Sequence, residues 1–168
     1  MDKEELRAVQ APLKEKYKTS PEKAEWILEA EGKLGEGIAC NVPTDAGEVE
    51  AGLHPATGGD GTQTCSGDML LEALVACAGV TLKSVATAME IEIAEGTVRA
   101  EGVLDFRGTM AVSKEAPVGF KSITLNFELD TAASGKRIEK LIELTERYCV
   151  IYQTLKNNPE LNTSVSIR

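Results

Sequence analysis

The fold is decided by residues 66–89, which read SGDMLLEALVACAGVTLKSVATAM. Ser66 is a favoured N-cap residue, and Asp68 complements the positive end of a helix dipole, so a helix should begin here. Residues 73–82 carry no charge, and their apolar side chains point in every direction around the helical wheel. A helix with this pattern is normally buried on all sides. Because the uncharged run is too short to span a bilayer, we predict the central helix of a soluble domain.

The composition describes an ordinary globular chain with an acidic surface. The chain has 168 residues, of which 42% are hydrophobic and 27% charged, with a net charge of −9. This length suits one domain. The negative charge argues against binding to nucleic acid or to an anionic membrane, both of which require basic surfaces. Because charged residues begin at position 2, we expect no secretory segment, and we expect a cytoplasmic protein.

The residues before the central helix divide into an arm and a sheet. Residues 1–22 contain many helix formers, with Pro12 among them, and predict a polar helical arm in one or two pieces. Alternating apolar residues then predict an antiparallel meander of three strands, over 26–30, 38–42 and 49–53. The glycine-rich loop 54–64 lacks the GxxxxGK[ST] pattern of phosphate-binding loops.

The residues after the central helix predict more strands and a second helix. Apolar alternation marks short strands near 91–93, 98–100 and 104–106, and it is strictest over 123–129. Residues 134–156 form an amphipathic pattern that packs by one face, with Ser134 as its N-cap. Residues 163–167 read as a last strand. The sequence therefore predicts an α+β domain over 23–168, with antiparallel sheets around two main helices.

The cysteines carry the candidate chemistry. Cys77 lies in the central helix and Cys149 on the apolar face of the second, and Thr81 and Ser84 lie close to the same face as Cys77. A thiolate can attack a peroxide and become a sulfenic acid, which a second thiol converts to a disulfide. The other interpretation is that these cysteines are packing residues, since free cysteine behaves as a small hydrophobe. With His54 as the one histidine and no CxxC, the spacing does not support a zinc site.

The stretch SGDMLLEALVACAGVTL resembles the central helix of the OsmC/Ohr family, whose motif of the type ELLLASLAAC-x-x-x-TL carries a peroxide-attacking cysteine. The segment ERYCV around Cys149 is similar to the region of that family's second cysteine. The resemblance spans residues 24–168 and implies an OsmC-like fold and an intertwined homodimer with the long helices at its centre. It also implies reduction of organic hydroperoxides by two cysteines, a lipoyl-type or other dithiol reductant, and no metal, haem or other cofactor.

Carried over by position, the resemblance makes Cys77 the peroxidatic cysteine and Cys149 the resolving one. The family's hydroperoxidase branch has Glu where this chain has Gly67, and Asp68 is the neighbouring carboxylate. The family's usual proline after the second cysteine is Val150 here, which would let the helix continue. Its activating arginine has no counterpart in residues 24–54. Arg7 in the arm is therefore the N-terminal candidate, ahead of Lys33.

Two functions follow as hypotheses. The first is a cysteine-based peroxidase with Cys77, Cys149, Asp68 and Arg7 in its site. The second is a catalytically silent OsmC-like dimer that binds an apolar ligand or a partner protein. The remaining candidates have less specific roles: Cys40 as a packing residue, Cys65 as an alternative thiol, His54 at a loop mouth, and Glu72 as a site or structural carboxylate.

Overall fold

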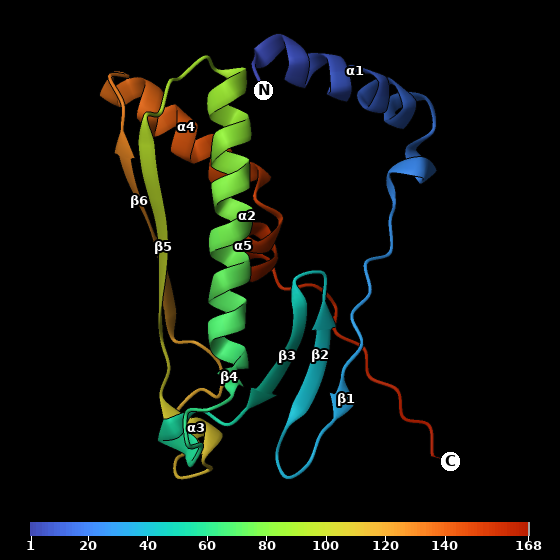
Figure 1. Cartoon of the computed structure of the whole chain (residues 1–168), viewed down its shortest axis with the longest axis vertical. Coiled ribbons are helices and arrows are strands. Elements are labelled where there is room, and N and C mark those ends of the chain that lie inside the picture. Colours follow the sequence, from blue (N-terminus) through green and yellow to red (C-terminus); the bar gives the residue numbers. More distant parts are fainter. Residues whose placement is uncertain (168) are drawn as a thin grey trace.

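The computed structural model describes residues 1–167 and has one long helix, α2, at its centre (Figure 1). The helices are α1 (Lys3–Thr19), α2 (Ser66–Ala88), α3 (Phe106–Thr109), α4 (Gly135–Tyr148) and α5 (Val150–Lys156), with short 3-10 turns η1 (Pro21–Ala24) and η2 (Pro55–Thr57). The strands are β1 (Lys33–Leu34), β2 (Cys40–Thr44), β3 (Gly47–Gly52), β4 (Thr64–Cys65), β5 (Glu95–Val103) and β6 (Ser122–Asp130). The predicted α+β class is confirmed.

Two sheets lie against different parts of α2. Strands β1, β2 and β3 form an antiparallel meander as expected, but its first strand is β1 at 33–34 rather than 26–30, and the short β4 adds a parallel pair to β3. Strands β5 and β6 form a two-stranded antiparallel sheet along the length of α2, while α4 and α5 pack on another side of the helix (Figure 1). Strand β6 keeps the strict alternation of half-buried and exposed residues that its sequence predicts.

The core consists of two clusters on one face of α2. Its fully buried positions recur every four residues, at Leu74, Ala78, Leu82 and Ala86. The first pair packs with Cys149, and the second pair packs with Leu141 of α4. The prediction that α2 is buried on all sides is wrong for the single chain, because Ala73, Ala76 and Val80 on its other side are exposed.

The length of α2 also exceeds the uncharged run in the sequence. The helix has 23 residues and is long and apolar enough to cross a membrane by length and composition alone. The core helix of a soluble protein passes the same test, and α2 packs against α4, α5 and β5 within this chain. Its N-cap is Cys65, so Ser66 is the first helical residue rather than the cap.

Several predicted strands are absent from the described part of the chain. Residues 26–30, 91–93, 104–106 and 163–167 form no strand. Apolar alternation indicates which side chains favour burial. A strand also needs a neighbouring strand with which its backbone can form hydrogen bonds, and these segments have none within the chain. Strand β2 instead runs through Pro43, which pairs with Glu48 of β3. Because β1 pairs only with residues 40 and 41, the missing N–H of Pro43 interrupts no ladder on that side.

The arm is a single continuous helix despite Pro12. Asp2 and Glu5 form a reciprocal capping box at its start, with both hydrogen bonds at 2.9 Å. Lys3 makes an ion pair of 2.7 Å with Glu90, just beyond the C-terminal end of α2. From that contact α1 extends away from the domain, and an extended segment leads back to β1 (Figure 1).

Candidate active site

The two helix-borne thiols are brought together at the centre of the molecule. Cys77 lies midway along α2 and is half-buried, whereas Cys149 between α4 and α5 is fully buried. Both belong to one packed cluster, and each thiol influences the pKa of the other. Residues that are 72 positions apart in the sequence thus form a pair of adjacent thiols.

A break in the second helical region positions Cys149. The sequence predicts one helix over 134–156, and Val150 favours its continuation, but α4 ends at Tyr148 and α5 begins at Val150. Cys149 has an extended backbone, with φ −73° and ψ 110°, which makes it both the C-cap of α4 and the N-cap of α5. Its N–H donates to the carbonyl of Thr145 at 2.9 Å, so the chain turns here without losing that hydrogen bond.

The first turn of α5 directs its free N–H groups at the two sulfurs. The first N–H groups of any helix have no acceptor within the helix. Here the N–H groups of Ile151 and Val150 lower the pKa of the Cys77 thiol. The N–H of Tyr152 donates to the Cys149 Sγ at 3.5 Å. The two thiols therefore lie at the N-terminal end of α5, where the positive end of the helix dipole favours a thiolate.

The surroundings shift the two thiol pKa values in opposite directions. Burial raises the pKa of the Cys77 thiol, but hydrogen bonds from the Ile151 N–H, the Cys149 thiol, the Val150 N–H and the Thr81 hydroxyl outweigh that effect, and the pKa is lowered overall. Burial raises the pKa of Cys149, and the adjacent Cys77 raises it further. Environments that separate two pKa values also separate two chemical roles. Cys77 therefore loses its proton at a lower pH than Cys149, which keeps its proton and remains a neutral thiol beside it.

The structure does not place the two charged candidates beside Cys77. Asp68 is nine residues earlier in α2, about 14 Å along the helix axis, and it lines a small cavity with Cys65 and His54. Arg7 lines a different pocket with Ala88, eleven residues after Cys77 and about 16 Å along the axis. Within one chain, hydrogen-bond donors rather than either charge adjoin the Cys77 sulfur.

The remaining sequence candidates lie outside the thiol pair. Cys40 pairs with Ala51 across the sheet, whereas Cys65 pairs with Gly52, the next residue of β3. Adjacent strand residues face opposite sides of a sheet, so Cys40 and Cys65 point to opposite faces. The His54 ring stacks on Phe106 with 4.8 Å between ring centroids, and its Nδ1 accepts the Ala56 N–H at 3.0 Å. Glu72 is exposed on α2.

A largely apolar pocket of about 740 Å³ adjoins the cluster that holds the two thiols, although neither cysteine lines it. It shares five residues with the cluster that holds the two thiols, namely Leu74, Ile123, Leu125, Phe127 and Tyr152. Glu146 and Lys156 also line it, so the cavity combines apolar walls with both signs of charge. Its volume is in the range of small-molecule sites.

Sequence reasoning missed the backbone donors of this site. It singled out Thr81, whose hydroxyl contacts Cys77, but not the N–H groups of Val150 and Ile151. The available signal was Val150 itself, since a residue other than proline keeps its N–H. Among the described residues, no group of three or more His, Cys, Asp or Glu side chains is arranged to hold a metal ion.

Comparisons with known proteins agree on one family. The family model for OsmC-like protein matches residues 59–164. Similar solved structures include an OsmC-like protein from Mycoplasma pneumoniae, with 19% identity, a TM-score of 0.67, and coverage of 80% of this chain and 90% of that one. An organic hydroperoxide resistance protein from Elizabethkingia anophelis has 17% identity, a TM-score of 0.64, and coverage of 80% and 92%.

A third similar structure is an organic hydroperoxide resistance protein from Legionella pneumophila, with 18% identity, a TM-score of 0.62, and coverage of 80% of this chain and 93% of that one. No curated protein matches the sequence. At these identities the solved structures establish the fold, and the family model covers more than half of the chain. The chain therefore belongs to the family of OsmC-like proteins.

Proposed function

We propose that this protein is a thiol-dependent peroxidase that reduces organic hydroperoxides. The observation that carries the proposal is the Cys77–Cys149 pair, in which hydrogen-bond donors lower the pKa of one thiol and burial raises that of its neighbour. Two of the similar structures above are organic hydroperoxide resistance proteins, which supports the same class of substrate. The largely apolar pocket that shares five residues with the thiol cluster suits an organic group better than hydrogen peroxide.

The proposed reaction has three steps, which are oxidation of Cys77, formation of a disulfide and reduction of that disulfide. The Cys77 thiolate attacks a peroxide oxygen, the O–O bond breaks, and the leaving alkoxide takes a proton to become an alcohol, which leaves Cys77 as a sulfenic acid. The Cys149 thiol then forms an S–S bond with Cys77, and the sulfenic hydroxyl leaves as water with the thiol proton. A dithiol reductant, of the lipoyl type or another, exchanges with this disulfide and becomes a disulfide itself.

Mass spectrometry with peptide mapping tests the proposal directly. The reduced protein is analysed before and after about one equivalent of cumene hydroperoxide. We expect a Cys77–Cys149 disulfide in the natural sequence and a sulfenic acid on Cys77 in Cys149→Ser. Cys77→Ser is the control and should consume no peroxide. Unmodified thiols in the natural sequence at this dose would refute the peroxidase.

The second candidate is a catalytically silent OsmC-like protein that binds an apolar ligand. It is favoured by the same 740 Å³ cavity, and by Gly67 in place of the family's Glu. If this candidate is correct, Cys77 should react with iodoacetamide below pH 7 no faster than a packing cysteine. Long-chain alcohols or fatty acids should then raise the melting temperature without any thiol oxidation.

The proposal also includes a cytoplasmic homodimer, as the family resemblance implies. The exposed apolar side of α2 supports a dimer, because large unpartnered apolar surfaces mark association sites. Arg7 and Asp68 remain in the proposal as candidate activators of Cys77, although neither adjoins it in its own chain. If either residue activates Cys77, Arg7→Ala or Asp68→Asn should slow peroxide consumption.

A further inference from the structure

Two pockets flank the N-terminal half of α2, and the side chain of Phe120 lines both of them. The larger one is the 740 Å³ pocket between α2, β6, α4 and α5. The smaller one has a volume of about 360 Å³ and lies between the first turns of α2 and the end of β5. Most of its lining is apolar, and its titratable members are His54, Cys65 and Asp68. A second, largely apolar space therefore lies behind the Phe120 ring.

Two glycines on different elements allow the Phe120 ring to stand between these pockets. The ring lies directly against the backbone of Gly102 in β5, where a Cβ atom would collide with it. A Cβ atom at Gly67, in the first turn of α2, would lie 3.5 Å from the ring Cζ, which is an ordinary van der Waals distance. The ring therefore reaches from β5 to α2.

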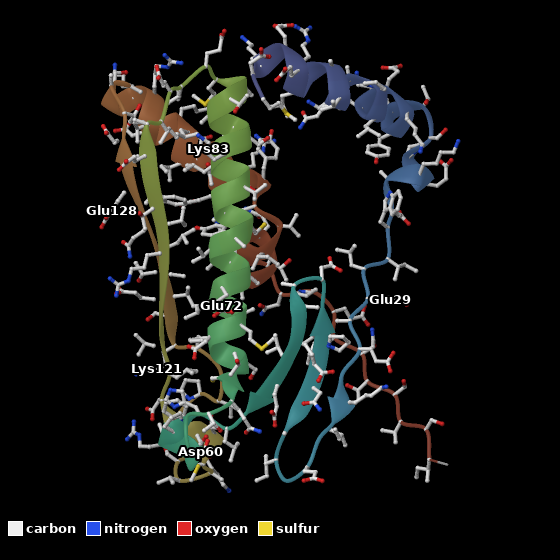
Figure 2. All side chains as sticks on the ribbon, viewed as in Figure 1. Glu29, Asp60, Glu72, Lys83, Lys121 and Glu128 are labelled. Carbon is white, nitrogen blue, oxygen red and sulfur yellow. The ribbon has the colours of Figure 1, made fainter. Side chains whose placement is uncertain are left out.

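The backbone beside the ring is anchored to the β5–β6 sheet. The N–H of Lys121, the next residue, donates to the carbonyl of Val103 at 2.8 Å. Lys121 lies at the end of that sheet that is level with the first turns of α2 (Figure 2). The position of the half-buried Phe120 ring between the two pockets is therefore set by strand pairing on one side and by α2 on the other.

We infer that Phe120 sets the length of the straight-chain apolar group that the larger pocket accepts. The ring is part of the wall of that pocket, and the smaller pocket lies directly behind it. An apolar pocket distinguishes ligands that differ by single CH2 groups through the space that its walls leave. The inference rests on the proposed function and deepens it, because it names the residue that selects among organic hydroperoxides by chain length.

Gly67 leaves the smaller pocket open. A side chain at this position, such as the Glu of the hydroperoxidase branch, would begin in contact with Phe120, the Cys65 sulfur and Leu104. All three of these residues line the smaller pocket, so the added side chain would extend into it. With glycine at position 67, this chain has room behind Phe120 for further carbons of a ligand.

Burial of additional CH2 groups makes such a length limit measurable. Each CH2 group that moves from water into an apolar space tightens binding roughly fourfold. The affinity for a straight chain should therefore rise with each carbon until the chain reaches the Phe120 ring, and carbons beyond that length should add nothing because they stay in water. Removal of the ring joins the two pockets, so the rise in affinity should continue for longer chains.

Binding of straight-chain primary alcohols, from butanol to dodecanol, tests this inference, because alcohols do not oxidise the thiols. We would measure dissociation constants by isothermal titration calorimetry for the natural sequence, for Phe120→Ala, and for a double variant with Phe120→Ala and Gly67→Leu. The natural sequence should reach a plateau of affinity as the chain lengthens. Phe120→Ala should move the plateau to longer chains and bind the longest alcohols at least tenfold more tightly, as roughly two more buried CH2 groups would give.

Two further variants show whether the space behind the ring is responsible. In the double variant, the Gly67→Leu change refills the smaller pocket and should restore the natural plateau. Leu155→Ala is the matched control, because Leu155 lines the larger pocket on α5 but not the smaller one. It should weaken the binding of all alcohols alike and leave the plateau at its natural length.

Three results would overturn the inference: no measurable binding of any alcohol to the natural sequence, the same plateau in Phe120→Ala as in the natural sequence, or a double variant that keeps the longer plateau. Circular dichroism shows whether each variant is folded. If Phe120→Ala does not fold, Phe120→Leu takes its place, and this smaller apolar side chain should move the plateau in the same direction by less.

The inference and the peroxidase proposal fail in distinguishable ways. Alcohol binding involves no thiol chemistry, whereas the peroxidase is tested by the Cys77–Cys149 disulfide that peptide mapping detects after treatment with a hydroperoxide. If both are correct, the dependence of kcat/KM on the chain length of alkyl hydroperoxides should follow the alcohol affinities, and Phe120→Ala should shift both to longer chains.

Discussion

Cys77 and Cys149 are chemically identical residues with different surroundings. Cys77 is half-buried and hydrogen bonds lower its pKa, whereas Cys149 is fully buried and its pKa is raised by burial and by the adjacent Cys77. The same contacts that bring the sulfurs together also make one of them the better nucleophile. The sequence indicated which cysteines were candidates, but their order of reactivity depends on neighbours from α5 that only folding supplies.

The lowered pKa of Cys77 predicts a distinct pH dependence of alkylation. Because its thiolate persists below the pH at which an ordinary thiol is protonated, Cys77 should react with iodoacetamide at pH 7 faster than Cys149. Its rate should fall as the pH drops through its own lowered pKa. Site-resolved mass spectrometry across pH 5–10 measures both rates, and equal rates at all pH values would contradict the assignment.

The same shifts affect folding stability with opposite signs. Cys77 has a lower pKa when folded, so the stability it contributes is present above its unfolded pKa and is lost as pH falls through the folded value. Cys149 has a raised pKa, so its contribution is present below its unfolded pKa and is lost as pH rises through the folded value.

Thr81 should act as a positioning residue for Cys77. Its hydroxyl is one of the donors that lower the Cys77 pKa, and it lies one turn further along α2. Thr81→Val keeps the side-chain volume but removes the donor, so alkylation of Cys77 at pH 7 should slow several-fold. Thr81→Ser should restore the rate. Ser84→Ala, one turn beyond, is the control and should leave the rate unchanged.

At the scale of elements, the break between α4 and α5 shapes the site. The sequence resemblance drew attention to Val150 because the family usually has proline there, and the expectation of a continued helix was wrong. The helix ends because Cys149 adopts an extended backbone and caps α5 with its own sulfur. Proline at this first helical position would fit the backbone, but it would have no N–H for Cys77.

Val150→Pro therefore separates the shape of the break from its hydrogen bonds. Proline is well tolerated as the first residue of a helix, so the variant should fold with unchanged helix content. Cys77 loses one donor, and its alkylation at pH 7 should slow by roughly tenfold, since a hydrogen bond to a charged group contributes about 1.5 kcal/mol or more. Val150→Ala keeps the N–H and serves as the control. Equal rates in both variants would show that the Val150 N–H does not activate Cys77.

The contact between α2 and α4 should dominate the stability of the helical layer. Leu141 is fully buried against Leu82 and Ala86, so Leu141→Ala leaves a cavity. We expect the free energy of unfolding to fall by about 2–5 kcal/mol, measured by urea denaturation. Val112→Ala, at a position that is 72% exposed, should change it by less than about 0.5 kcal/mol. A loss below 1 kcal/mol at Leu141 would contradict the packing described here.

At the scale of the whole molecule, the single chain leaves much apolar surface uncovered. Trp26, Ile27 and Leu28 are 76%, 87% and 91% exposed, and only 22% of the most apolar stretch of α2 is buried. Isolated exposed apolar residues are common, but three consecutive ones, together with an exposed helix face, indicate association surfaces. The arm and the extended segment lie on the side of α2 away from β5 and β6 (Figure 1).

The arm should therefore contribute to association more than to folding. Leu13 is 47% exposed in the single chain, so Leu13→Asp should leave the monomer folded while weakening a dimer held by the arm. We expect its dimer dissociation constant, measured by sedimentation, to rise at least tenfold. Lys18→Asp, at an exposed position of the same helix, is the matched control and should have a smaller effect. Identical constants for both variants would exclude a role for Leu13.

The sequence by itself determined the α+β class, the central helix, strand β6, the identity of the two helix-borne cysteines and the family. These features depend on local periodicity and on a motif within one helix, which the order of residues records directly. Only the tertiary structure decided that Cys149 lies beside Cys77, that the second helical region breaks at Cys149, and that two backbone N–H groups of α5 lower the pKa of Cys77. It also decided which segments became strands, since 26–30 and 163–167 alternate as β5 and β6 do but have no partner edge in the chain. The physical reason is that burial, hydrogen bonding and strand pairing depend on which distant segments become neighbours, and local sequence patterns do not specify those neighbours.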